Sequence, residues 1–316
     1  MHRFTLHTSH FILITFILST LLTGCRSEHQ LSAGEHQAEI EQWHRDRIDR
    51  LKEPQGWLRL AGLYWFDEPV QTFGTAGDVD FLFPEGSVPA YAGRFELQSD
   101  TIRMYPADGL HILADGQPLD NAVIYTPTYS AELQYGRLTW MVIQRGDLTG
   151  IRLFDTESEI LKRFRGIERY PPDLEYRVMA KLVPHDVPTT IPVTNILGQT
   201  SDEESAGKLV FDLKGETHEL TVLGTGDRLF IIIADETGST ETYPGGRYIY
   251  VDNPGPGGTT VLDFNKAYNP PCAFSPYTTC QLPPEGNTLP LAVLAGEKLP
   301  AHLLNRQLQT IRHPDL

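Results

Sequence analysis

The sequence has few cysteines, no excess of positive charge and only one long hydrophobic run. Its 316 residues include three cysteines, and 26 lysines and arginines are outnumbered by 41 aspartates and glutamates, for a net charge of −15. Such a surface repels phosphate backbones and no basic cluster interrupts it, so we do not expect nucleic acid as a partner. Anionic membrane surfaces are repelled too, so any attachment to a bilayer needs another cause.

The sequence motifs of common enzyme classes are also missing. There is no G-x-S-x-G elbow, H-E-x-x-H motif, Walker A loop or G-x-G-x-x-G turn. The histidines after the N-terminal run, such as His44, His111, His185 and His218, are scattered, and none lies at ligand spacing from another. We therefore expect neither a zinc enzyme nor a Rossmann oxidoreductase, and the sequence predicts no metal and no cofactor.

The one long apolar run lies at the N-terminus and has the form of a secretion signal. It extends from Phe11 to Leu22 after a short polar start with Arg3. This length is too short for a transmembrane helix but fits the core of a signal peptide. No other segment is apolar enough to span a bilayer, so the rest of the chain is predicted to be soluble.

The run ends in Leu22-Thr23-Gly24-Cys25, which resembles the bacterial lipobox. The resemblance implies cleavage after Gly24 and a diacylglycerol on the Cys25 sulfur; the alternative is an ordinary secretory signal with a chance cysteine. Each buried methylene of an acyl chain contributes about 0.8 kcal/mol, so a lipidated Cys25 would anchor the chain to the lipid bilayer. We expect a lipid-anchored protein of the cell envelope. Because Arg26 follows the cysteine, the pattern resembles that of the outer membrane, on its periplasmic side, if the host has two membranes.

The remaining chain is predicted to be mostly β after one helix. Residues 1–24 form the signal peptide and 25–34 a polar tether. Apolar residues at helical spacing predict a helix over 35–56. Short alternating runs separated by turn signals then predict a β-sandwich-like domain over 57–168. Further runs after Tyr170-Pro171-Pro172 predict a second β domain over 169–316, a barrel or sandwich of about eight strands.

The order of the runs between 73 and 146 resembles forkhead-associated sandwiches. Those domains bind phosphothreonine through an arginine after the first glycine and a serine two strands on. Here these places hold Thr75 and the segment 89–91. The resemblance therefore implies the sandwich fold and not its binding chemistry.

Two C-terminal stretches, ADETGSTETYPGGRYIYVD (234–252) and VLDFNKAYNPPCAFSPYTTCQLPPEGNTLPLAVLAGEK (261–298), closely resemble the signature of a bacterial family known as domain of unknown function 1684. The segment EQWHRDRIDRLKEPQGWLRLAGLYWF (41–66) resembles the opening of the same family. The resemblance covers nearly the whole mature chain. It implies no particular reaction.

Polar residues in these stretches suggest a pocket. Period two in TTVLDFN places Asp263 and Asn265 on one face of a strand, and GGRYIYVD begins with Arg247. If the two segments are paired across 253–258, Arg247 opposes Asp263 or Asn265 and could help bind a polar ligand. The alternative is a buried Arg–Asp pair that fixes strand register. The predicted pocket walls are Glu241, Tyr243, Arg247, Asp263, Asn265, Tyr268 and Asn269.

Two functions follow from this predicted pocket. The first is binding of a small polar or envelope-derived ligand without catalysis, which the missing catalytic motifs favour. The second is a hydrolase in which Asp263 or Glu241 acts as acid and base and Arg247 stabilises an anion. The density of carboxylate, arginine and tyrosine motivates the second.

Cys272 and Cys280 are the only cysteines left once Cys25 is lipidated. In an oxidising compartment two such neighbours most often form a disulfide, which would stabilise the fold by roughly 2.5 kcal/mol. A thiol nucleophile, a redox role and metal ligation are the alternatives. Four prolines around the pair predict a rigid loop. Its aromatic residues, Tyr268, Phe274 and Tyr277, would either close a core or form a stacking platform.

Overall fold

The computed structural model describes residues 31–300, which are mostly β with one long helix near the N-terminus, as the sequence predicts. The predicted signal peptide, the lipidation at Cys25 and most of the predicted tether lie outside the described residues. Among those residues, no helix is both long and apolar enough to cross a membrane.

Helix α1 spans Ala33–Lys52 and lies against the C-terminal half of the chain through one face. Four of its residues are buried, namely His36, Ile40, Arg47 and Leu51. They are separated by four, seven and four residues, which places them in a single stripe, as helical periodicity requires. Two of the four are polar, so this face needs polar partners as well as apolar ones. The helix stops before Pro54, which cannot continue a hydrogen-bonded helix.

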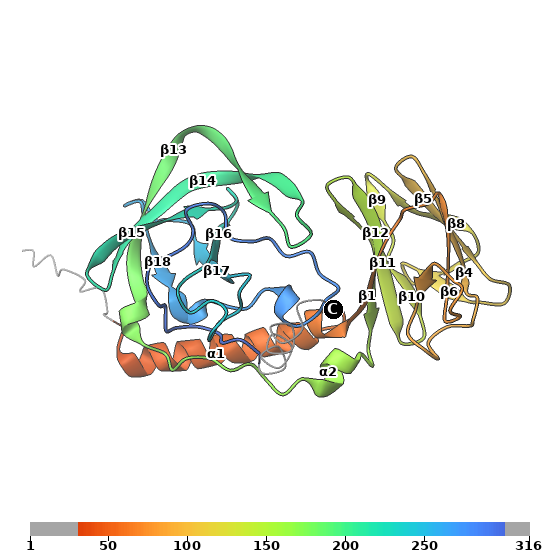
Figure 1. Ribbon diagram of the computed structural model, residues 1–316, viewed down its shortest axis with the longest axis horizontal. Coiled ribbons are helices and arrows are strands. Elements are labelled where there is room, and N and C mark those ends of the chain that lie inside the picture. The colour runs from red at the N-terminus through yellow and green to blue at the C-terminus, as the bar shows by residue number, and fades with distance from the viewer. Residues whose placement is uncertain (1–30, 301–316) are drawn as a thin grey trace, which may run out of the picture. The chain divides into compact units, whose positions relative to one another are not determined.

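Residues 60–155 form a sandwich of two six-stranded sheets that share one core (Figure 1). Phe73, Phe95 and Trp140 fill its centre and are fully buried. The first sheet has the order β1-β12-β11-β10-β6-β7 and the second β3-β2-β4-β5-β8-β9. The 3₁₀ turn η1 (Trp57–Arg59) joins α1 to β1. The strands are β1 (Leu60–Trp65), β2 (Val70–Gly74), β3 (Phe81–Leu82), β4 (Gly93–Gln98), β5 (Thr101–Pro106), β6 (Ile112–Ala114), β7 (Gln117–Leu119), β8 (Ala122–Thr126), β9 (Tyr129–Ser130), β10 (Leu133–Tyr135), β11 (Leu138–Arg145) and β12 (Leu148–Asp155).

Residues 177–263 form a curled half-barrel. A four-stranded sheet of order β15-β14-β13-β18 lies beside the two-stranded sheet β16-β17, and both bury apolar residues in one core. Figure 1 shows β13 and β14 as a long, strongly curved hairpin. Short helical turns, α2 (Glu159–Arg163) and η2 (Leu174–Tyr176), precede the sheet. The strands are β13 (Arg177–Thr194), β14 (Thr200–Leu213), β15 (Glu216–Val222), β16 (Arg228–Ile233), β17 (Arg247–Asp252) and β18 (Thr259–Asp263), followed by η3 (Phe264–Lys266) and η4 (Pro271–Ala273).

The half-barrel has six strands where the sequence predicts about eight. The apolar runs 176–183 and 190–198, two of the roughly eight counted, belong to one strand, β13, with an irregular register between Pro184 and Thr189. The apolar run 289–296 forms no strand, because Pro290 lacks a donor and Gly296 takes a positive φ of 80°. Strand β12 is not among the predicted runs at all.

The buried stripe of α1 should contribute strongly to stability. Ile40 is 1% exposed, and its truncation removes buried methyl groups and leaves a cavity. We expect Ile40→Ala to lower the free energy of unfolding by about 2–5 kcal/mol. Asp49→Ala, on the exposed side of the same helix, is the matched control and should change it by less than about 0.5 kcal/mol. Urea denaturation measures both; equal effects would show that α1 is not docked as described.

Candidate functional site

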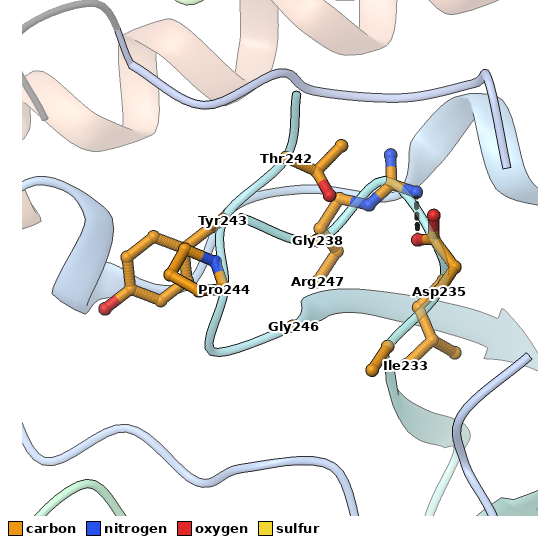
Figure 2. A pocket seen from close by; sticks show the side chains of 9 residues that line it. Ile233, Asp235, Gly238, Thr242, Tyr243, Pro244, Gly246 and Arg247 are labelled. Carbon is orange, nitrogen blue, oxygen red and sulfur yellow. Dashed lines mark hydrogen bonds and ion pairs between the residues drawn. The ribbon is translucent and has the colours of Figure 1, made fainter. Parts of the chain in front are cut away.

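The structure places Arg247 in a closed environment, without a ligand chamber. Its side chain is 1% exposed, and its Nη2 donates to Asp235 Oδ2 at 2.7 Å (Figure 2). The guanidinium also donates to the backbone carbonyls of Val293, at 3.1 Å, and Ala295. The cavity beside it measures about 10 Å³, which is room for at most one water molecule. Arg247 therefore holds the 289–296 segment against the half-barrel.

Asp263 ends β18 and contacts α1 through His36, and Asn265 follows it in η3. The Asp263 carboxylate is 2.8 Å from His36 Nε2 and 3.7 Å from Arg177 Nε. Its other oxygen accepts from the backbone and side-chain amides of Asn265 at 3.0 and 2.8 Å. Leu262 and Phe264 point the other way, into the core, so the predicted alternation is present. Asp263 thus provides the buried partner that His36, a polar residue of the α1 stripe, requires.

Asn269 belongs to a second buried cluster, built around Arg47 of α1. Arg47 Nη2 donates to the Asn269 carbonyl at 3.0 Å, and its Nε is 3.4 Å from Glu297 Oε1. Glu297 Oε2 accepts from the Asn269 backbone amide at 2.8 Å. Burial raises the pKa of the Glu297 carboxyl, and the attraction of Arg47 opposes this rise. The cluster fixes the start of the proline-rich loop.

Glu241 and Tyr243 belong to neither the Asp263 cluster nor the Arg47 cluster. Glu241 is exposed, accepts from the Tyr170 hydroxyl at 3.0 Å and lies 3.3 Å from Lys298 Nζ. Tyr243 packs against the apolar cluster around Leu51, and burial raises its pKa. In Figure 2 its ring points away from the Arg247 guanidinium. The predicted pocket residues thus lie in separate networks.

The expected pairing of Arg247 with Asp263 or Asn265 is wrong. Strand β17 forms its ladder with β16, where Arg247 lies opposite Ile233, and β18 forms its ladder with β13. The connection 253–258 contains Pro254 and Pro256, which lack donors and fix φ, so it cannot form a tight hairpin turn. The arrangement on which the hydrolase hypothesis depends is therefore not present.

A much larger cavity lies elsewhere and measures about 530 Å³, within the usual range for small-molecule sites. Its walls come from η1, from strands β11, β12, β16 and β17, from the ends of the β13–β14 hairpin and from the cysteine loop. It is lined by Trp57, Arg145, Gly146, Arg152, Asn195, Gln199, Thr200, Ser201, Glu203, Phe230, Tyr248, Tyr250, Tyr268, Pro271, Thr278, Thr279, Cys280 and Gln281.

Aromatic side chains dominate one wall of this cavity. Tyr248 and Tyr250 alternate with core residues along β17, so both face outward, and Phe230 lies opposite Tyr250 on β16. The Phe230 and Tyr250 rings stack with centroids 4.8 Å apart, and Tyr250 stacks against Tyr268 at 6.4 Å. The alternation of side chains along the strands thus places these aromatic rings on the face turned away from the half-barrel core, where they line the cavity.

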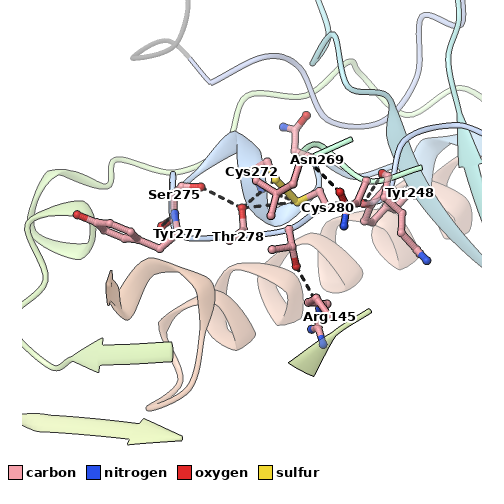
Figure 3. Close-up of a disulfide and its surroundings, with 12 residues drawn as sticks. Arg145, Tyr248, Asn269, Cys272, Ser275, Tyr277, Thr278 and Cys280 are labelled. Carbon is pink, nitrogen blue, oxygen red and sulfur yellow. Dashed lines mark hydrogen bonds between the residues drawn. A yellow bond between two sulfur atoms is a disulfide. The ribbon is translucent and has the colours of Figure 1, made fainter. Parts of the chain in front are cut away.

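The cysteine loop forms an adjoining wall. Cys272 and Cys280 form the expected disulfide, with Cα atoms 6.1 Å apart (Figure 3). The Thr278 hydroxyl donates to the Ser275 carbonyl at 3.1 Å inside the closed loop. Of the loop's aromatic residues, Phe274 is buried beside α1, as core closure requires, whereas Tyr268 lines the cavity. Phe274 therefore helps to close a core, whereas Tyr268 is placed where a ligand could stack on it.

Three charged side chains also line the cavity, namely Arg145, Arg152 and Glu203. None of them was a candidate from the sequence, and neither were Trp57, Phe230, Tyr248 and Tyr250. The signal for Arg152 was present in the run GIRLFD, where one arginine interrupts a strand that is otherwise apolar at its centre. Of the predicted pocket residues, only Tyr268 lines this cavity. Among residues 31–300, no group of three His, Cys, Asp or Glu side chains is placed to hold a metal ion.

The fold is thus that of a mostly β protein with a curled half-barrel. Residues 162–298 match the family described as "Protein of unknown function (DUF1684)", so the chain carries a domain of this family. The match does not include 41–66, so that part of the resemblance stays a prediction. No curated protein matches the chain.

Solved structures give further similarities. An uncharacterized protein of Haloarcula marismortui, known from a solution NMR structure, is 34% identical, over 43% of this chain and 78% of that chain, with a TM-score of 0.37. An engineered FHA with Myc-pTBD peptide is 13% identical over 31% of this chain and 76% of that chain, with a TM-score of 0.16. Rad53 1–466 in complex with AMP-PNP is 11% identical over 70% of this chain and 60% of that chain, with a TM-score of 0.14.

The disulfide should stabilise the loop that borders the cavity. Replacing both Cys272 and Cys280 by serine removes the cross-link, and we expect a loss of roughly 2.5 kcal/mol in the free energy of unfolding. Urea denaturation with and without reductant measures this. Reductant should lower the midpoint of the wild type and leave that of the double variant unchanged. A wild-type midpoint that equals that of the double variant would contradict the structural role.

Proposed function

We propose that this chain is a lipid-anchored protein of the cell envelope that binds a small, ring-bearing polar ligand in the 530 Å³ cavity and does not transform it. The single observation that carries the proposal is the cavity itself, with five aromatic side chains among its walls. Such rings offer flat apolar faces, and the tyrosine hydroxyls offer polar rims. Sites of this kind bind ligands that are partly apolar and partly hydrogen-bonding.

The contacts that hold the walls of the cavity in place favour a preformed site. Tyr268 is held between Arg47, whose Cζ lies 4.6 Å from the ring centroid, and Tyr248, whose backbone exchanges two hydrogen bonds with it. The cysteine loop is closed by the disulfide and stiffened by Pro270 and Pro271. Preorganised walls lower the ordering cost of binding, which suits a binding protein.

Binding is favoured over hydrolysis because the candidate catalytic residues are occupied. Arg247 is paired with Asp235, Asp263 with His36, and Glu241 with Lys298. None of the three candidates lines the large cavity. Among the residues that line that cavity, the Ser201 hydroxyl donates to Glu203 at 2.8 Å, and no histidine is present to act as its base.

The lipid anchor and the envelope location are part of the proposal. They rest on the Leu22-Thr23-Gly24-Cys25 pattern and on Arg26, which follows the cysteine in place of an aspartate; this resembles the pattern of the periplasmic side of an outer membrane in a host with two membranes. The Cys272–Cys280 disulfide agrees with this location, because disulfides persist in oxidising compartments outside the cytosol.

The aromatic wall gives a direct test of ligand binding. Tyr250 is 43% exposed and stacks on Phe230, so Tyr250→Ala should remove a contact surface at little cost in stability. We expect the neutral probe 2-naphthalenemethanol to bind the full-length chain and Tyr250→Ala to weaken binding roughly two- to tenfold. Fluorescence titration measures this, and Tyr91→Ala, at a tyrosine 48% exposed on the sandwich, is the control. Equal binding by all three proteins would place the probe outside the cavity, and the absence of binding would refute the proposal.

The anchor is tested separately at Cys25. We expect the wild type to be cleaved after Gly24, to carry lipid on Cys25 and to partition into the detergent phase. Cys25→Ser should remain uncleaved and lack the added lipid mass, because serine offers no thiol for acylation. Intact-mass spectrometry of the protein isolated from its membrane fraction reads both changes. A wild-type mass without lipid would contradict the anchor and leave the ligand site untouched.

A further inference from the structure

Arg152 lies on the face of β12 that is turned away from the sandwich core. Its neighbours Ile151 and Leu153 point into that core, and strand alternation sends Arg152 to the opposite side. There its guanidinium carbon lies 5.7 Å from the centre of the Trp57 ring, and the side chain lines the 530 Å³ cavity. Only 8% of the residue is exposed, so the charge has lost most of its contact with bulk water.

This buried charge has no compensating acid. Among residues 31–300 Arg152 forms no ion pair, and its Nε has no hydrogen-bond partner. The other deeply buried arginines, Arg47 and Arg247, are both paired with carboxylates. A buried and unpaired cation is costly, and it is unexpected in a chain with a net charge of −15.

A second cation increases the positive potential of the same cavity. Arg145, at the end of β11, donates from Nε to the Thr279 hydroxyl at 3.1 Å and from Nη1 to the Gln144 carbonyl at 2.7 Å (Figure 3). It too forms no ion pair among the described residues. Burial, and to a lesser degree the charge of Arg145, lowers the pKa of Arg152 to about 10, which still leaves it charged at neutral pH.

The one carboxylate that lines the cavity is already engaged. Glu203 accepts from the Ser201 hydroxyl and from Gln281 Nε2, each at 2.8 Å. It forms no ion pair with either arginine. The cavity therefore combines an aromatic wall with two cations whose charge no protein group neutralises.

We propose that the ligand is a ring-bearing acid whose anionic group, a carboxylate or a phosphate ester, binds the Arg152 guanidinium while its ring lies on the aromatic wall. Arg145 contributes a second positive charge to the anionic group. This inference rests on the proposed ligand-binding function and narrows it to one chemical class. An arginine fork matches the geometry of both anions, and a hydrogen bond to it gains strength where water is excluded.

Three probes that share the same naphthalene ring distinguish the contribution of the anionic group to affinity from that of the ring. We expect 2-naphthoate or 2-naphthyl phosphate to bind the full-length wild type at least about tenfold more tightly than 2-naphthalenemethanol, in line with charge-assisted hydrogen bonds. The stronger of the two anions identifies the carboxylate or the phosphate as the natural group. Isothermal titration calorimetry at fixed ionic strength measures all three affinities.

Arg152→Met keeps the length of the side chain and removes its charge. We expect this variant to bind the anions no more tightly than the alcohol and to leave the affinity for the alcohol unchanged. Arg152→Lys should keep part of the preference for anions. Arg163→Met removes an exposed arginine that is 81% accessible on α2, and Glu203→Gln removes the cavity carboxylate; neither should lower anion affinity.

A stability measurement separates a ligand-binding role from a structural one. Because Arg152 has no carboxylate partner to lose and its buried charge is costly, Arg152→Met should have a melting temperature equal to or above that of the wild type. A variant that unfolds, or equal wild-type affinities for the anions and the alcohol, would overturn the inference about the anion. In the second case the proposed ring-binding function would stand. If none of the three probes binds, both proposals fail.

Discussion

The described structure depends most on the contacts of Arg47, a buried cation of α1. Its guanidinium lies over the Tyr268 ring, donates to the Asn269 carbonyl and pairs with Glu297. These contacts connect the helix to the loop that begins with residue 268 and to the segment that ends at residue 298. Glu297 is 1% exposed, so removing Arg47 would leave a buried carboxylate without its cation, a change that typically costs about 3–5 kcal/mol. The position of Tyr268, and with it one wall of the cavity, follows from this interaction.

A contrast between two kinds of buried arginine connects the fold to the function. Arg47 and Arg247 are saturated by carboxylates and carbonyls, so they hold segments together and have little capacity left for a ligand. Arg152 is also buried, but among residues 31–300 it forms no ion pair and lies over the Trp57 ring. A charge that is costly to bury persists where it serves something other than stability, since sequences depart from local rules mainly at functional sites. The candidate site is therefore the 530 Å³ cavity and not the set of polar residues predicted from the C-terminal stretches.

The sequence could predict the elements but not their partners. Periodicity places α1, the sandwich strands and the two faces of β18, and the count and compartment of the cysteines predict the disulfide. The partner of Arg247 is Asp235, at the end of the preceding strand, and no local pattern shows that β17 pairs with β16 and not with β18. The run GIRLFD marks Arg152 as unusual, but its burial depends on Trp57, which lies almost a hundred residues earlier and which no local pattern connects to it. Tyr268 is among the predicted pocket residues because its loop is unusual in composition, whereas Tyr248 and Tyr250 are not among them.

The proposed site therefore depends on the charge of Arg152, which a bound ligand would neutralise. The most direct measurement is a crystal structure of the full-length protein grown with 2-naphthoate. The account predicts the carboxylate within hydrogen-bond distance of the Arg152 guanidinium and the ring against the wall formed by Tyr250 and its neighbours. An Arg152 side chain paired with a carboxylate of the protein itself, with the cavity filled by its own side chains, would contradict it.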